Sequence, residues 1–146
     1  MSDSSLAILR LMNEYCSAVD AGDFETFAKL FEHGVFHVIG DPAGPLVGRE
    51  AVMGLLQNVT LYEGKPLTKH VLSNVQIDVD ESNGKATAQS YITVFQCVPP
   101  DFPLQPIFIG HYHDTFERSG SVWRFKNRSI SPDLIGDISH HRSDMA

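Results

Sequence analysis

The sequence changes character at Pro66. Before this residue, apolar side chains recur at helical spacing, whereas after it the chain forms long runs rich in β-branched and aromatic residues. Four strands are predicted, over 70–80, 85–98, 106–120 and 121–131, with the turn sequences SNG and SGS at two of the junctions. Helices followed by strands are typical of an α+β fold. We therefore predict a curved antiparallel sheet with the N-terminal helices packed on one face, enclosing a deep apolar pocket.

Three helices are predicted in the first part. Ser4 or Ser5 can cap the first, and Gly22 ends it. Asp23 can cap a second helix over 23–34, and a third is predicted over 49–62. A short strand over 35–40 and a loop over 41–48 connect the second helix to the third. A further loop, PPDFPLQP at 99–106, separates two of the strands and is expected at the pocket mouth.

Length and charge restrict the class of protein. The 146 residues suit one domain, with a core over about 6–137 and a polar C-terminal tail over 138–146. A formal net charge of -7 argues against a general affinity for nucleic acid or for an anionic membrane, and no apolar run is long enough to span a bilayer. Cys16 and Cys97 lack the spacing of a metal clip and are expected to be reduced thiols. With no secretory signal pattern, this predicts a cytoplasmic protein.

An acidic residue stands near the end of the first predicted helix, in EYCSAVDAGDF. Asp20 lies in the last turn, where a negative charge is unfavourable with the helix dipole, so it needs a compensating partner. By itself it can be a turn or solvent-facing acid, and His70 can be a surface residue at the start of a strand. Tyr15 can be a core aromatic residue. The residues alone leave these alternatives open.

Several short motifs occur in a characteristic order. They are Y-x-x-x-x-D-x-G-D-F, then LF, G-R-E, T-x-H-x-x-x-N, G-x-Y-x-D and W-R-F-x-x-R. In this order the chain, from about Leu6 to Asp137, resembles the SnoaL-like branch of the nuclear transport factor 2-like superfamily, which includes scytalone dehydratase, bile-acid dehydratases and ketosteroid isomerase. The resemblance implies a single SnoaL-like domain, a cone-shaped α+β fold, and usually a dimer packed sheet to sheet. The fold does not fix the function, because it also hosts carriers and association modules.

The resemblance implies a catalytic set of Asp20, His70 and Tyr15. Removing water β to a carbonyl requires a base for the α-proton and an acid for the leaving hydroxyl, and an imidazole can serve as both near neutral pH. A carboxylate on its other nitrogen fixes the tautomer, and a phenol can donate to an oxyanion. We expect a cofactor-free dehydratase or isomerase acting on a polyketide, steroid or terpenoid type of substrate. The alternative is a non-catalytic small-molecule-binding or dimerisation module.

The pattern of the family is incomplete in this chain. The second histidine of scytalone dehydratase has no counterpart, and Gln96 or Thr93 stands in the corresponding region. Gln96 can orient a carbonyl or water but cannot act as a base. The aspartate of ketosteroid isomerase would fall within 35–40, where His37 is the ionisable residue. Gln96 and Thr93 are the predicted polar substrate contacts, and the predicted aromatic contacts are Phe36, Phe95 and Phe108.

The remaining histidines carry weaker expectations. His111 and His113 share a strand face, but no third ligand is evident and the chemistry of the family is metal-free, so no metal site is predicted. His140 and His141 belong to a tail expected to be solvated. In the late strands, apolar residues occur on both faces, as in Val94 beside Phe95. One face can line the pocket, and the other must be covered, so we expect a homodimer.

Overall fold

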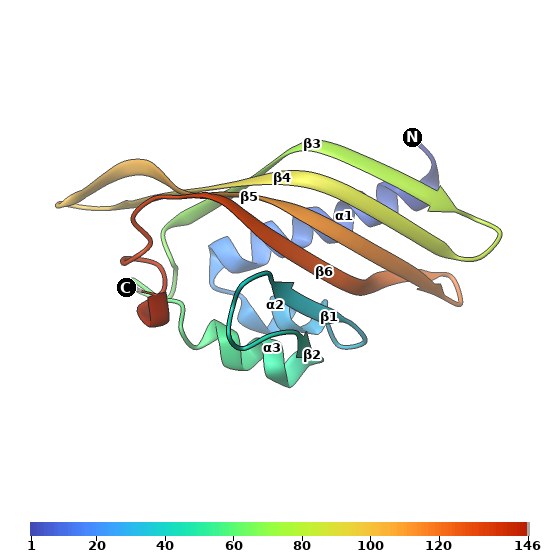
Figure 1. Cartoon of the computed structure of the whole chain (residues 1–146), viewed down its shortest axis with the longest axis horizontal. Coiled ribbons are helices and arrows are strands. Elements are labelled where there is room, and N and C mark those ends of the chain that lie inside the picture. The colour runs from blue at the N-terminus through green and yellow to red at the C-terminus, as the bar shows by residue number, and fades with distance from the viewer. Residues whose placement is uncertain (146) are drawn as a thin grey trace.

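The computed structural model describes residues 1–145, so Ala146, the last residue of the predicted domain, lies outside the described residues. Six strands form one sheet in the order β2-β1-β6-β5-β4-β3. The four long strands, which are antiparallel neighbours, are β3 (Thr68–Asp80), β4 (Lys85–Val98), β5 (Phe102–Ser119) and β6 (Val122–Ile135). Figure 1 shows them as a long curved layer with the helices on one side. The predicted α+β class is confirmed.

Three α-helices precede the long strands: α1 (Asp3–Ala21), α2 (Phe24–Lys29) and α3 (Arg49–Leu56). Gly22 ends α1 in the left-handed conformation, at φ 76°, and Asp23 caps α2 by accepting a hydrogen bond from the Thr26 backbone N–H. Both predicted boundaries are therefore confirmed. The cap of α1 is Ser2 rather than Ser4 or Ser5, because the Ser2 hydroxyl accepts from the Ser5 N–H.

Other connections differ from the prediction. The helix predicted over 49–62 ends at Leu56, because the backbone after it pairs with the C-terminal segment: the Thr60 N–H donates to the His141 carbonyl at 2.8 Å. The short strand β1 (Val35–Val38) is present but pairs in parallel with β6, and β2 (Leu46–Val47) forms within the predicted loop. The segment 99–106 is mostly strand, since β5 begins at Phe102, and a tight turn joins it to β4.

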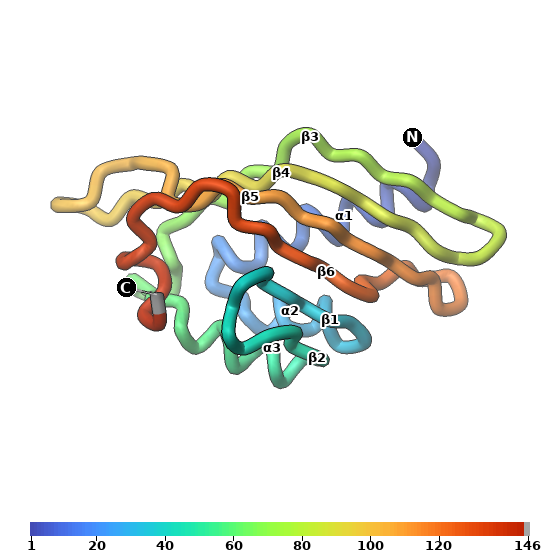
Figure 2. The backbone as a smooth tube through the Cα atoms, viewed as in Figure 1, coloured from blue at the N-terminus to red at the C-terminus, as the bar shows by residue number. Residues whose placement is uncertain are grey.

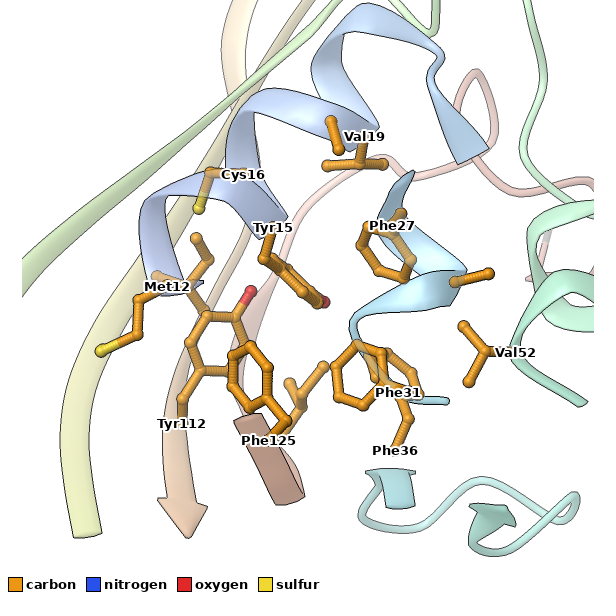
Figure 3. Packing of buried hydrophobic residues seen from close by; sticks show 14 of the residues in the cluster. Met12, Tyr15, Cys16, Val19, Phe27, Phe31, Phe36, Val52, Tyr112 and Phe125 are labelled. Carbon is orange, nitrogen blue, oxygen red and sulfur yellow. The ribbon is translucent and has the colours of Figure 1, made fainter. Parts of the chain in front are cut away.

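The curvature of the sheet has local causes. The register between β3 and β4 shifts between Ser73 and Gln76, where Asn74 has φ 54°, and the register between β5 and β6 shifts at Gly110 and again at Phe116. An extra residue on one strand bends it and increases its twist. The bent sheet and the helices enclose an aromatic core, seen in Figure 3, that includes Tyr15, Phe31, Phe36, Tyr112 and Phe125.

The C-terminal segment folds back onto the body of the domain. After β6 it turns and lies beside the segment that joins α3 to β3, as the red and green parts of the tube in Figure 2 show. Val59 and Arg142 form an antiparallel bridge there, and a short 3-10 helix follows over Ser143–Met145. In the part of the chain that the structure describes, no helix is long and apolar enough to cross a bilayer.

Candidate active site

A cavity of about 140 Å³ lies between the helices and the sheet. Most of its wall is apolar, and Phe36 and Phe108, two of the predicted substrate contacts, are part of it. Three nitrogen-bearing side chains also line the cavity: His70, His141 and Arg142. The His70 and His141 rings lie close together, with 6.3 Å between their centroids. A pocket of this kind can bind a largely apolar molecule and hold a polar group of it near two imidazoles.

Asp20 and His70 are in direct contact. The last turn of α1 places the Asp20 carboxylate against the start of β3, where Oδ1 lies 2.6 Å from His70 Nδ1. The same carboxylate accepts from the His70 backbone N–H at 2.8 Å and from the Thr68 hydroxyl at 2.7 Å. The side chains of Asp20 and His70 are only 10% and 9% exposed. Three hydrogen bonds therefore supply the compensation that a carboxylate needs at a helix C-terminus.

These contacts determine the charge of Asp20 and the tautomer of His70. Burial raises the pKa of Asp20, but the hydrogen bonds from His70 and Thr68 outweigh it, so the pKa lies below the usual value. Asp20 is therefore ionised at neutral pH and can only accept hydrogen bonds. His70 must then carry a proton on Nδ1, so in the neutral ring the lone pair is on Nε2.

Tyr15 lies deeper, at some distance along α1 from Asp20. Its ring lines the cavity and is 5.7 Å from the Tyr112 ring between centroids. Burial raises the pKa of Tyr15 to about 12, so the phenol stays protonated and can act as a donor. The structure thus places Tyr15 at the same cavity as the Asp20–His70 pair, but not in contact with that pair. Figure 3 shows Tyr15 among Phe27, Tyr112 and Phe125.

A buried ion pair lies behind the two tyrosines. Arg128 Nε and Nη2 donate to the two carboxylate oxygens of Asp114 at 2.8 and 2.9 Å, and neither side chain is exposed. The guanidinium lies over the Tyr112 ring at 3.8 Å and over the Tyr15 ring at 4.3 Å. The sequence analysis did not single out this pair. The sequence pattern that could have indicated it is a charged residue that alternates with buried aromatic residues along a strand. Asp114 ends the motif G-x-Y-x-D in this way, and Arg128 ends W-R-F-x-x-R.

Three predicted substrate contacts lie outside the wall of the cavity. Thr93 and Phe95 alternate with the buried Val94, so they face the outer side of the sheet. Gln96 is buried, but its amide donates to the Pro66 carbonyl at 3.0 Å and to the His140 carbonyl at 3.1 Å. In this structure Gln96 therefore connects the start of β3 to the C-terminal segment.

The C-terminal segment contributes to the wall of the cavity. Ile138, His141 and Arg142 line it, so the expectation of a solvated tail is wrong for these residues. Besides Gln96, the Tyr62 hydroxyl donates to the His140 carbonyl at 2.6 Å, and the Phe102 ring stacks on the His140 ring. Sequence reasoning missed His141 because the tail has no periodicity, and side chains distant in sequence hold it in place.

The strand histidines His111 and His113 are not among the residues that line the cavity. His111 Nδ1 lies 2.8 Å from Asp133 Oδ2, on the partly exposed surface formed by β5 and β6. The His111 and His113 rings are 5.1 Å apart between centroids. Over residues 1–145, no three or more His, Cys, Asp or Glu side chains are grouped so that they could hold a metal ion.

Comparison with solved structures supports the fold. A scytalone dehydratase-like protein of Novosphingobium aromaticivorans is 28% identical, with a TM-score of 0.73 over 94% of this chain and 91% of that one. A protein of unknown function from Mycobacterium tuberculosis, Rv3472, is 23% identical, with a TM-score of 0.73 over 90% and 73% of the two chains. ActVI-ORFA of Streptomyces coelicolor is 18% identical, with a TM-score of 0.75 over 90% and 98%.

A search of proteins with curated functions gave no match. The family model of the SnoaL-like domain, in contrast, matches residues 1–129, which is most of the sequence. The solved structures similar to this chain include a nuclear transport factor 2-like protein of N. aromaticivorans, at 25% identity. The chain therefore belongs to the SnoaL-like domain family, within the nuclear transport factor 2-like fold.

Proposed function

We propose that this protein is a lyase or isomerase that moves a proton on a small molecule by means of Asp20 and His70. One observation carries the proposal: an ionised, buried carboxylate lies 2.6 Å from Nδ1 of a histidine that lines a mainly apolar cavity. A structural ion pair would not need the other side of the ring to face a cavity. Perturbed groups at a cavity are the usual mark of a site that transfers protons.

The proposed reaction begins on the neutral His70 ring. Nε2 takes a proton from the carbon next to a substrate carbonyl, and the electron pair of the C–H bond forms an enolate. Asp20 stabilises the resulting imidazolium through Nδ1–H. In a dehydration, the imidazolium returns the proton to the β-hydroxyl, the C–O bond breaks, and water leaves with formation of C=C. In an isomerisation, the proton returns to another carbon. Tyr15 is proposed to donate a hydrogen bond to a substrate oxygen.

The lining of the cavity supports a substrate class. Its mainly aromatic and aliphatic wall suits an apolar body, and the imidazoles suit a polar oxygen on it; the volume of about 140 Å³ admits about one ring of a polyketide, steroid or terpenoid type of molecule. The similarity to a scytalone dehydratase-like protein, at 28% identity, agrees with dehydration of an oxygenated ring compound. The protein chain itself supplies every group in the proposed proton transfer, so the proposal includes no cofactor or metal.

A second candidate function is a non-catalytic binding module of the same fold. The observation in its favour is that Gln96 donates to backbone carbonyls and Thr93 faces away from the cavity. Neither residue therefore adds a polar contact to a substrate. Such a module would bind the same class of molecule without turning it over.

We further propose that the protein is cytoplasmic and that it forms a homodimer. The two subunits would pack through the outer faces of their sheets. Val71, Thr93, Ile109 and Leu134 are paired in register across β3, β4, β5 and β6, so they form one row on that face. Val71 is 46% exposed and Leu134 65% exposed. The three aliphatic members of this row form apolar surface that a second subunit can cover. We expect Leu134→Lys to shift the mass in solution from dimer to monomer. Val122→Lys, also exposed on β6 but outside the row, should leave the mass unchanged, and a monomeric wild type would contradict the proposal.

The catalytic proposal can be tested by following carbon-bound protons in D₂O. The protein is incubated with a panel of cyclic β-hydroxy ketones and β-hydroxy thioesters, and NMR records the loss of α-proton signals and the appearance of vinyl signals. We expect turnover of at least one compound. We expect Asp20→Asn and His70→Ala to lower its rate about 100-fold or more, because general acid–base groups contribute at least that much.

Asp23→Asn is the matched control, since Asp23 is an exposed cap three residues from Asp20. It should retain the wild-type rate. A loss of less than about tenfold in both Asp20→Asn and His70→Ala would overturn the assignment of these residues. Binding of panel members without any exchange or elimination would favour the binding module.

A further inference from the structure

The C-terminal segment places a second imidazole at the cavity, outside the matched part of the family. The family model ends at residue 129, whereas His141 lies twelve residues further on. Its ring lines the same cavity as His70, with 6.3 Å between the ring centroids. A substrate oxygen that lies between the two rings can contact both.

The surroundings of His141 indicate which of its nitrogens is free. Nδ1 is buried and has no hydrogen-bond partner among residues 1–145, whereas Nε2 is not among the buried unpaired atoms. A buried N–H without an acceptor is more unfavourable than a bare lone pair, so the proton of the neutral ring belongs on Nε2. Nε2–H is therefore the donor of this ring, which forms part of the cavity wall.

The ring is neutral over the physiological range. Burial lowers the pKa of His141 to about 4, and the neighbouring His70 and Arg142 act in the same direction, against a smaller opposing effect of Asp20. A neutral imidazole is a hydrogen-bond donor that does not protonate an enolate outright. The neutral His141 ring can thus stabilise a negative charge on a substrate oxygen by a hydrogen bond, without transferring its proton to that oxygen.

The segment that carries His141 is fixed on both sides. Gln96 and Tyr62 donate to the carbonyl of His140, and the carbonyl of His141 accepts from the Thr60 N–H. The next residue, Arg142, is paired with Asp144 through two hydrogen bonds of 2.8 and 2.7 Å. A donor held in this way needs little reorganisation when charge develops on the substrate.

We propose that His141 donates a hydrogen bond from Nε2–H to the carbonyl oxygen of the substrate and stabilises the enolate that forms when His70 removes the neighbouring proton. This role rests on the proposed function of the site. It requires, as the proposed reaction does, a substrate whose reacting carbon lies next to a carbonyl group. His141 neither gains nor loses a proton during the step, and the proton follows the route through His70 described above.

The first test uses 4-nitrophenol as an oxyanion probe, because its anion absorbs visible light and binding can be measured without turnover. Two variants separate donation from shape: His141→Gln keeps a neutral N–H donor, and His141→Phe keeps a planar ring without a donor. We expect His141→Phe to weaken binding of the anion about ten- to a hundredfold, the range for a hydrogen bond to a charged group. His141→Gln should lose less than about tenfold.

His140→Phe is the matched control, because His140 is the neighbouring residue and stacks on Phe102 without lining the cavity. It should bind the anion as the wild type does. Unchanged anion binding in His141→Phe would overturn the proposal, and so would equal losses in His141→Phe and His141→Gln. If His141→Phe does not fold, ¹⁵N NMR of the wild-type imidazoles decides: the His141 Nε2 signal must shift on addition of the anion.

A second test uses the compound that the NMR panel identifies. His141→Phe should lower kcat more than it raises KM, because the bond strengthens as charge develops, and His141→Gln should restore part of kcat. Activity lost in His70→Ala but retained in His141→Phe would overturn only the role of His141. Full activity in both Asp20→Asn and His70→Ala would overturn the proposed function, while the binding test of His141 would still stand.

Discussion

Gly22 and Gly64 are so close that a Cβ atom on Gly22 would overlap the carbonyl oxygen of Gly64. The end of α1 and the segment that leads into β3 meet at this point. Asp20 lies two residues before Gly22, and Thr68 and His70 follow Gly64 by a few residues. The absence of a side chain on Gly22 thus permits the approach that brings Asp20 into contact with His70.

We expect Gly22→Ala to destabilise the protein by about 2 kcal/mol or more, because left-handed backbone strain adds about 1 kcal/mol and the steric overlap adds to it. Gly44→Ala is the control: Gly44 has a similar φ of 67°, but among the described residues, apart from its two chain neighbours, no atom lies within 4 Å of an added Cβ. It should show the backbone strain alone. Denaturant unfolding of both variants measures the difference, and equal losses would mean that the close approach is unimportant.

The buried ion pair predicts a large effect of Asp114→Asn. This change leaves the Arg128 charge without a counter-ion at a position where neither side chain is exposed to solvent. An unpaired buried charge typically lowers the free energy of unfolding by about 3 kcal/mol or more. Asp133→Asn removes a carboxylate paired with His111 on the partly exposed surface and should change stability by less than about 1 kcal/mol. Chemical unfolding checks both, and a similar small effect of the two variants would contradict the prediction.

The lowered pKa of His141 predicts a loss of stability as the pH falls from about 6.5 to about 4. In this window the unfolded chain binds a proton at position 141 that the folded protein does not bind, so folding becomes less favourable at lower pH. The groups facing His141 are His70, Arg142 and Asp20.

The contribution of His141 to this loss reaches about 3 kcal/mol, the equivalent of a shift from 6.5 to about 4. In His141→Gln the fall in unfolding free energy between pH 7 and pH 4.5, from urea titrations, should therefore be smaller than in the wild type by that order. The lowered pKa of Asp20 acts separately: its stabilisation is present above the ordinary value and is lost only as the pH falls below about 4. An identical pH dependence in wild type and His141→Gln would show that His141 is not shielded from water.

Tyr62→Phe tests the attachment of the C-terminal segment. It removes the hydroxyl that donates to the His140 carbonyl, a bond that contributes about 1 kcal/mol to holding the segment. The effect should be local, with faster hydrogen exchange over 138–143 and little change in the long strands. Tyr91→Phe, in which the exposed ring loses a hydroxyl that is not hydrogen-bonded within the described residues, is the control. Faster exchange in the strands as well would mean that the segment and the sheet open together.

The sequence was informative wherever one residue type has a specific local role. Gly22 and Asp23 define a helix end and a helix start through their own backbone and side-chain chemistry, and both are where the pattern predicted them. The contact between Asp20 and His70 was expected from the family resemblance and is present. Their role in catalysis stays a prediction.

The sequence was less informative wherever the same pattern is compatible with two different structures. Period-2 alternation separates Thr93 and Phe95 from Val94 and Gln96 but does not tell which set faces inward when both contain apolar residues. The position of His141 depends on bonds from Gln96 and Tyr62 to backbone carbonyls. No hydrophobic pattern encodes such bonds, so the tail was wrongly expected to be solvated.

One wall of the cavity is formed by a segment outside the sheet and beyond the part of the chain that the family model matches. Substitutions at Ile138 or Arg142 change this wall without touching the strand pairing that holds the fold together. The C-terminal segment is thus a place where the preference for the bound molecule can diverge, and a library randomised at Ile138 and Arg142, with His141 kept, is a direct route to altered selectivity.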